Sequence, residues 1–117
     1  KREMIAQKYI SRLMDCSFIR LPLIQKGNTH VFHLFVIKAK NRDELREYLS
    51  KNGISTGIHY PTPLPMLPVY KSKYFNNRNQ FSEALANSPL LLSLPMFPDL
   101  STDQIEYVTD RIKEFYA

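Results

Sequence analysis

Two uninterrupted apolar runs constrain the fold of this chain more than any other feature of its sequence. Residues 31–37 read Val-Phe-His-Leu-Phe-Val-Ile, and residues 90–94 read Leu-Leu-Leu-Ser-Leu before Pro95 ends the run. Short runs that are apolar on both faces are typical of central, buried strands. The sequence therefore predicts strands near 31–38 and 90–94 that pair with each other. A small domain has few helices to cover both faces, so we expect part of this surface to lie against another domain.

Four segments have the apolar spacing of amphipathic helices. They span residues 1–15, 41–52, 80–87 and 101–116, with apolar stripes at Ile5, Tyr9 and Leu13, at Leu45, Tyr48 and Leu49, at Phe81, Ala84 and Leu85, and at Ile105, Val108, Ile112 and Phe115. Asn41 with Glu44, and Ser101 with Gln104, have the spacing of a capping box, so both helices are predicted to begin there.

The first helix lacks the usual signals of a helix start. No Ser, Thr, Asp or Asn precedes it, and Lys1 and Arg2 place positive charge where the helix dipole is already positive. We therefore interpret residues 1–16 as the truncated end of a longer helix, and residues 17–117 as the domain that follows it.

The stretch from Gly53 to Pro63 combines a helix stop, a short strand and a proline-rich exit. Asn52-Gly53 supplies a left-handed residue, and Pro61 cannot donate to a sheet. Between them, residues 54–60 alternate in character, with Ile54, Thr56, Ile58 and Tyr60 on one face and Ser55, Gly57 and His59 on the other. This alternation predicts a strand over 54–60. It places His59 among small neighbours that a ligand can approach, and Tyr60 on the face that suits core packing.

These elements together predict one α/β domain, and a chain of 117 residues is long enough for one domain with one core. Its sheet is small and mainly antiparallel, built from residues near 17–22, 31–38, 54–60 and 90–94. The helices 41–52 and 101–116 should cover one face of that sheet. His33, inside the first apolar run, is interpreted as a structural histidine with a backbone or water partner rather than as a catalytic one.

Composition narrows the class of protein. Residues 1–51 hold 11 Lys and Arg against 5 Asp and Glu, within a net charge of +5, but the basic residues are scattered singly. This favours a solvated surface that meets an acidic partner over a nucleic-acid interface. No apolar run approaches the roughly 18 residues of a membrane span. Cys16 is the single cysteine, which excludes an internal disulfide and favours the cytoplasm, and the three histidines show no metal-ligand spacing.

The connection over residues 61–79 is long for a compact domain. It carries prolines at 61, 63, 65 and 68, followed by aromatic and basic residues. Connections of this length are commonly functional or mobile. The Pro-Thr-Pro-Leu-Pro segment is also compatible with a polyproline ligand for an aromatic groove.

The motif Gly-Ile-Ser-Thr-Gly-Ile-His-Tyr-Pro-Thr-Pro-Leu, at residues 53–64, resembles the C-terminal part of the DegT-type sugar-nucleotide aminotransferases. The resemblance extends over nearly the whole chain, through Leu92–Pro98 to the last helix. It implies the small C-terminal domain of an enzyme of the aspartate-aminotransferase fold. That parent enzyme would be a cytoplasmic homodimer that moves an amino group from an amino acid to a keto-sugar nucleotide.

The resemblance also implies which domain of the parent enzyme holds the cofactor and which binds the substrate. Pyridoxal phosphate (PLP) is held in that family by a lysine of the upstream large domain, so this segment would contribute no catalytic, cofactor or metal ligand of its own. His59 and Tyr60 match the family motif, and the resemblance implies that they bind the substrate. The family has a second histidine in a Pro-Leu-His pattern, whereas Pro65 stands at that position here.

Two other classes of function remain open from the residues alone. One is a freestanding basic α/β binding module, which rests on the charge and on the strand-helix-strand order. The other is the small domain of a catalytically inactive regulatory homologue. A PLP-binding lysine upstream of Lys1 would distinguish the enzyme from both.

Overall fold

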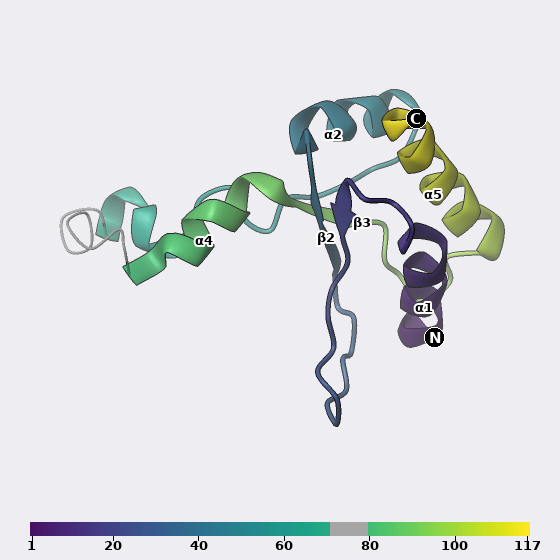
Figure 1. Cartoon of the computed structure of the whole chain (residues 1–117), viewed down its shortest axis with the longest axis horizontal. Coiled ribbons are helices and arrows are strands. Elements are labelled where there is room, and N and C mark those ends of the chain that lie inside the picture. Colours follow the sequence, from purple (N-terminus) through teal and green to yellow (C-terminus); the bar gives the residue numbers. More distant parts are fainter. Residues whose placement is uncertain (71–79) are drawn as a thin grey trace.

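An antiparallel sheet organises the chain in residues 1–70 and 80–117, the part that the computed structural model describes. Within these residues the sheet has three strands, β1 (Ile19–Arg20), β2 (Phe35–Ala39) and β3 (Leu91–Leu94), in the order β1-β2-β3 (Figure 1). Strands β2 and β3 pair with Phe35 opposite Leu94 and Lys38 opposite Leu91. The predicted pairing of the two apolar runs is therefore confirmed, with β2 in the centre.

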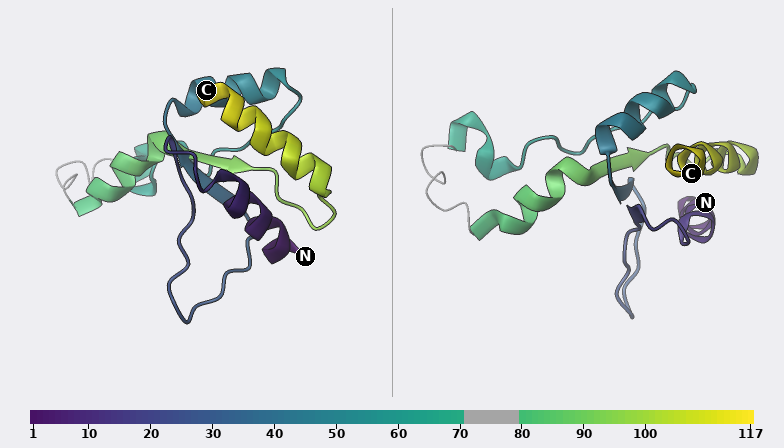
Figure 2. Two further views of the ribbon diagram at one scale, coloured as in Figure 1. Left: turned by 45° about the vertical axis from the view of Figure 1, so that its right-hand side comes forward. Right: turned by 45° about the horizontal axis from the view of Figure 1, so that its top comes forward.

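Helices cover one face of this sheet and leave the other open. Phe35, Ile37 and Ala39 are buried, whereas Val36 and Lys38, which point to the opposite face, are half-buried. Helices α1 (Arg2–Leu13), α2 (Arg42–Lys51) and α5 (Thr102–Tyr116) lie on the buried side (Figure 2). The predicted helical cover by 41–52 and 101–116 is confirmed, while no described element seals the second face.

The core joins α1 to the sheet and to α5. The ring of Tyr9 stacks on Phe35 with 4.9 Å between centroids, and its hydroxyl donates to the carbonyl of Pro95 at 3.0 Å. Arg12 Nε donates to Thr109 Oγ1 at 2.7 Å, and the same guanidinium forms ion pairs with two carboxylates of α5, those of Glu106 and Asp110. The predicted stripe of Ile5, Tyr9 and Leu13 is buried.

Two of the three predicted helix-end signals are confirmed by the structure. Ser101 and Gln104 form the predicted capping box, because each residue's backbone N–H donates to the other's side chain. Gly53 ends α2 with a φ of 73°, as predicted. The capping box of Asn41 and Glu44 is wrong: Asn41 takes the left-handed conformation, which asparagine tolerates, and its side chain makes no cap hydrogen bond.

Two predicted strands are shorter in the structure. The segment 17–22 forms a ladder only at Ile19–Arg20, and residues 31–34 precede β2. In residues 31–34, side chains occupy the backbone groups: the N–H of Phe32 donates to His30 Nδ1, and Arg2 Nη1 donates to the carbonyls of Phe32 and His33. His33 therefore lies outside the strand and is exposed, so its prediction as a strand residue is wrong.

The predicted strand 54–60 is wrong, since it forms a single bridge between Gly57 and Ser93. If the ladder continued from this bridge, the next hydrogen-bonded pair on one side would be Ser55 and Pro95. Pro95 has no N–H to donate. On the other side, the carbonyl of Leu91 already accepts from Arg42 Nη1 at 2.9 Å. Both ends of the ladder are thus blocked by sequence and by a buried arginine.

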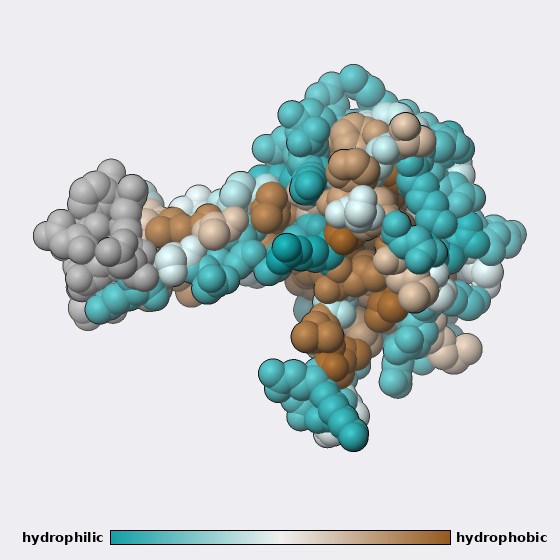
Figure 3. Space-filling model, in the orientation of Figure 1, coloured by the Kyte–Doolittle hydropathy of each residue, from teal (hydrophilic) through white to brown (hydrophobic). Residues whose placement is uncertain are grey.

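Two segments project from the sheet and its helices. Residues 21–34 form a long loop between β1 and β2, apolar near its base and hydrophilic at its tip (Figure 3), with Leu23 and Val31 exposed. Residues 61–70 and 80–90 form an extended arm (Figure 1) that contains η1 (Leu64–Met66), α4 (Ser82–Asn87) and η3 (Ser88–Leu90).

The arm contains the predicted 80–87 helix as α4, and its 3₁₀ turn replaces a continuous polyproline segment at 64–66. The remainder of the predicted 61–79 connection, residues 71–79, lies outside the described residues. Among residues 1–70 and 80–117, no helix has the length and hydropathy to cross a membrane.

Removing the hydroxyl of Tyr9 tests the link between α1 and β3. Tyr9→Phe keeps the ring but leaves the carbonyl of Pro95 without its donor, so we expect the free energy of unfolding to fall by about 1 kcal/mol at neutral pH. Urea unfolding measures the change. The exposed Tyr60→Phe exchange is the control, and an equal loss in both variants would contradict the role of this hydrogen bond.

The same tyrosine predicts a pH dependence. Burial raises the pKa of Tyr9 above its usual value, so the unfolded chain loses this proton first as the pH rises. Tyr9 therefore stabilises the fold below about pH 10, and that contribution is lost progressively above it. Stability should fall less steeply above about pH 10 in Tyr9→Phe than in the natural chain. Identical slopes would show that this group does not titrate with unfolding.

Candidate functional site

The open face of the sheet carries a histidine fixed at the edge of β3. The backbones of Gly57 and Ser93 exchange two hydrogen bonds, of 3.0 and 2.8 Å. Residues 57 and 59 lie on the same side of this extended segment, and Ser93 points to the same face as Val36. His59 Nδ1 lies 2.9 Å from Ser93 Oγ. The imidazole is thus held against the face that the helices do not cover.

Gly57 makes room for this ring. A Cβ at position 57 would lie 2.6 Å from His59 Cε1 and 3.3 Å from Nδ1. The first distance is shorter than the contacts that Cβ atoms make in folded proteins, so any side chain at position 57 would displace the imidazole from Ser93. The group that approaches this glycine most closely is the ring of His59.

The hydrogen bond to Ser93 leaves the second nitrogen of the ring available. His59 is half-buried, and within the described part of the chain its Nε2 has no hydrogen-bond partner. An imidazole anchored through one nitrogen can bind a phosphate or sugar oxygen, or move a proton, through the other. No group of three or more metal-ligating side chains occurs among residues 1–70 and 80–117.

Tyr60 lies next to His59 and points out of the core. Its ring meets the imidazole edge-on with 5.5 Å between centroids, and its side chain is 73% exposed. The core position that alternation suggested for Tyr60 is therefore wrong, because the bridge at Gly57 does not continue as a strand. On the predicted apolar face only Ile54 is buried, while Thr56 and Ile58 are half-buried.

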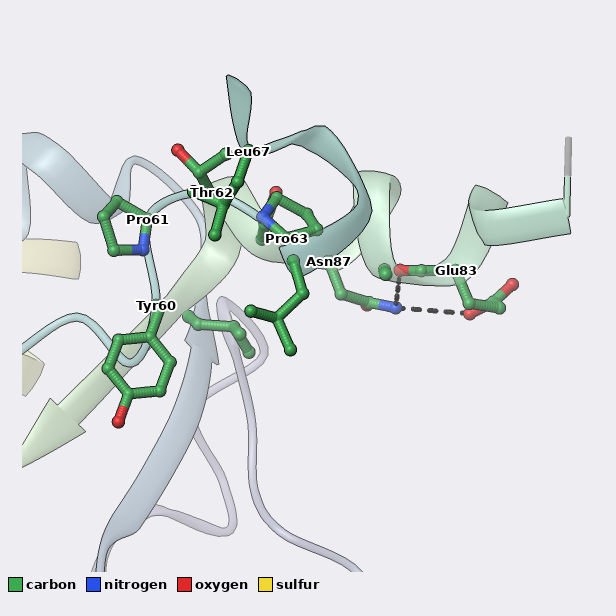
Figure 4. A pocket seen from close by; sticks show the side chains of 11 residues that line it. Tyr60, Pro61, Thr62, Pro63, Leu67, Glu83 and Asn87 are labelled. Atoms are coloured by element: carbon green, nitrogen blue, oxygen red, sulfur yellow. Dashed lines mark hydrogen bonds between the residues drawn. The ribbon is translucent and has the colours of Figure 1, made fainter. Parts of the chain in front are cut away.

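A pocket of about 620 Å³ opens beside Tyr60, between residues 60–67 and helix α4 (Figure 4). Its walls are mainly apolar, and the polar residues in its lining are Tyr60, Thr62, Glu83, Asn87 and Ser88. The amide of Asn87 is held by Glu83, since Nδ2 donates to the Glu83 carbonyl and to Oε2 at 2.6 and 3.2 Å. This size and this mixture of walls are typical of small-molecule sites. We refer to it as the arm pocket.

Sequence reasoning singled out His59 and Tyr60 but missed the residue that positions the first. Ser93 is 4% exposed, and it is the one hydroxyl within an apolar strand. A polar side chain in such a run needs a partner when buried, which was a usable signal. Pro65, where the resembled family has a histidine, lies in η1 and does not line the arm pocket.

Gly57→Ala should detach His59 from Ser93 without unfolding the chain. The backbone at 57 suits alanine, and the added methyl group pushes the ring away. We expect the ¹⁵N resonances of the His59 ring to change while the melting temperature changes little. Ser55→Ala, in the same segment but exposed, is the matched control. Unchanged ring resonances in Gly57→Ala would contradict the observed packing.

Comparison with known protein families matches residues 1–113 to the DegT/DnrJ/EryC1/StrS aminotransferase family. A pleiotropic regulatory protein of Geobacillus stearothermophilus is 44% identical over 90 residues, which are 77% of this chain and 24% of that protein. The dTDP-3-amino-3,4,6-trideoxy-alpha-D-glucose transaminase of Streptomyces venezuelae is 33% identical over 115 residues, 98% of this chain and 30% of that protein.

The solved structure of S. venezuelae DesV, in complex with a ketimine intermediate, superposes with a TM-score of 0.91 at 33% identity. The match covers 97% of this chain and 30% of that one. The predicted fold class is confirmed by this likeness. The chain spans between 24% and 31% of the length of the curated relatives that it matches.

Proposed function

The chain belongs to the DegT/DnrJ/EryC1/StrS aminotransferase family, and on that premise we propose that it is the small domain of a PLP-dependent aminotransferase. The parent enzyme moves an amino group from an amino acid to a keto-sugar nucleotide. The observation that carries this proposal is a fold match over 97% of the chain to a structure named for a ketimine intermediate, of which the chain covers 30%. Residues 1–16 then link the domains, and residues 17–117 form the small domain.

The residues around His59 do not by themselves form a PLP site. Among the described residues, the lining of the arm pocket includes no lysine, and neither Gly57 nor Ser93 offers a side-chain amine. PLP, when bound, acts as the electron sink of transamination. We therefore assign the cofactor to an upstream large domain of the same polypeptide, and assign to this chain the binding and orientation of the substrate.

His59 and Tyr60 are the residues that this role requires. Ser93 fixes the imidazole at 2.9 Å, so Nε2 is presented on the open face in one orientation. The side chain of Tyr60 lines the arm pocket and is exposed, so its hydroxyl can donate to a phosphate or sugar oxygen. A preoriented pair of this kind lowers the cost of ordering a bound substrate.

Two exposed surfaces of this small domain are candidates for contact with another domain or subunit. The second face of the sheet lacks a described cover, and the loop 21–34 exposes Leu23 at 90% and Val31 at 80%. Large exposed apolar side chains of this kind mark surfaces that meet another protein surface. We propose that they contact the upstream domain or a second subunit of a cytoplasmic homodimer.

A regulatory homologue without activity is the second candidate. The relative from Geobacillus stearothermophilus, at 44% identity, bears the name of a pleiotropic regulatory protein. Assay of the full-length protein separates the two: an enzyme transfers the amino group at a measurable rate with PLP present, and an inactive regulator does not.

His59→Ala in the full-length protein tests the substrate-binding role. We expect kcat/KM to fall at least tenfold, about 1.4 kcal/mol, while the melting temperature changes little. The control is Ile54→Asp, which places a carboxylate at a position only 5% exposed and should destabilise the fold by several kcal/mol. If His59→Ala melts early but turns over normally per folded molecule, the residue is structural.

The isolated 117-residue chain should neither bind PLP stably nor transaminate, because the lysine is assigned to the upstream domain. The measurement is visible absorption of the lysine-bound cofactor after incubation with PLP. A stoichiometric band, trapped by borohydride on one of the chain's own lysines, would refute this division of labour.

A further inference from the structure

Three cations without counter-ions gather at the β1 end of the open sheet face. Arg20 and Lys38 are direct partners across β1 and β2, so their side chains leave the sheet on the same side. Lys40 follows two residues after Lys38, and its Nζ lies 5.5 Å from the ring centre of Phe18. All four side chains line a pocket of about 340 Å³, which we call the basic pocket.

The arrangement costs stability in the absence of an anion. Like charges directly opposite each other in an antiparallel pair repel. Every ion pair found among residues 1–70 and 80–117 involves other cations, and the basic pocket has no acidic residue in its lining. Its other polar groups, from Ser17 and Asn87, are neutral donors as well as acceptors. The charge is therefore complementary to a multivalent anion.

The basic pocket adjoins the arm pocket. Asn87 lines both, and the neighbouring Leu90 and Leu91 line one each. In Figure 3, strongly hydrophilic side chains lie beside apolar surface where the arm meets the sheet. An anionic group in the basic pocket can therefore carry an attached organic moiety toward the larger, mainly apolar pocket beside Tyr60.

We propose that Arg20, Lys38 and Lys40 form a binding site for a diphosphate group, such as that of a nucleoside diphosphate. A diphosphate carries several negative charges on adjacent phosphorus centres, so cross-strand neighbours can donate to it together. A single carboxylate would leave part of the like-charge repulsion uncompensated. That this diphosphate belongs to the sugar nucleotide of the reaction rests on the proposed function, whereas the site itself does not.

Isothermal titration of the 117-residue chain tests the site directly. Inorganic pyrophosphate and thymidine diphosphate should each bind with one-to-one stoichiometry, and thymidine should bind far more weakly. Amide resonances should shift at residues 18–20, 38–40 and 87–90. Absence of pyrophosphate binding, equal binding of thymidine, or shifts confined to other residues would overturn the proposal.

Variants separate a defined site from general charge attraction. Arg20→Gln/Lys38→Gln/Lys40→Gln should weaken pyrophosphate binding at least tenfold. The matched control, Lys26→Gln/Arg46→Gln/Lys51→Gln, removes the same charges from the 21–34 loop and from α2, and should leave binding within about twofold. Equal losses in both triple variants would show that net charge alone is responsible.

The Lys38→Glu variant distinguishes a direct loss of binding from a loss of binding caused by unfolding. It places a carboxylate opposite Arg20, which relieves the repulsion, so the melting temperature should hold or rise while pyrophosphate binding is lost. Retained binding in this variant would overturn the proposal. Because none of these measurements involves transamination, an inactive full-length protein that still binds pyrophosphate would refute the proposed function and leave the diphosphate site standing.

Discussion

The antiparallel pairing of β2 with β3 is the interaction on which the rest of this structure depends. It joins residues far apart in the chain, from Phe35 opposite Leu94 to Lys38 opposite Leu91. On one side this pairing presents a dry surface to α1, α2 and α5, where Tyr9 stacks on Phe35. Each helix buries its apolar stripe only because that surface exists, since helices of this length gain most of their stability from packing.

The same pairing fixes the candidate site through one residue. Ser93 contributes its backbone to Gly57 on the outer edge of β3 and its hydroxyl to His59 on the open face. A change in the register of β3 by one residue would turn that hydroxyl into the core and leave His59 without its partner. The position of the imidazole is thus a consequence of how the two apolar runs align.

The contrast between the two faces of the sheet places the candidate site on one side of the molecule. One face is buried beneath three helices, while the other presents His59, the cations of the basic pocket and the entrance to the arm pocket. Charged and titratable groups persist there because water, or a ligand, can solvate them. The chain belongs to an aminotransferase family, and the function proposed above assigns substrate binding to this open face.

The sequence by itself determined the two paired apolar strands, the helices that flank them, the capping box at Ser101 and the left-handed stop at Gly53. These features depend on local periodicity and on the conformational preferences of single residues, and both can be read from short stretches of sequence. It also indicated His59 as a residue of an accessible face, from the small size of its alternate neighbours.

Only the tertiary structure decided how far the strands extend and what surrounds the histidine. Residues 54–60 have the alternation of a strand, yet the ladder ends after Gly57 because Pro95 lacks a donor and Arg42 occupies the carbonyl of Leu91. The placement of Tyr60 outside the core, the contact of His59 with Ser93 and the meeting of Arg20 with Lys38 join segments distant in the chain. Such contacts depend on which strands pair and in what register, and local patterns of residues do not contain that information.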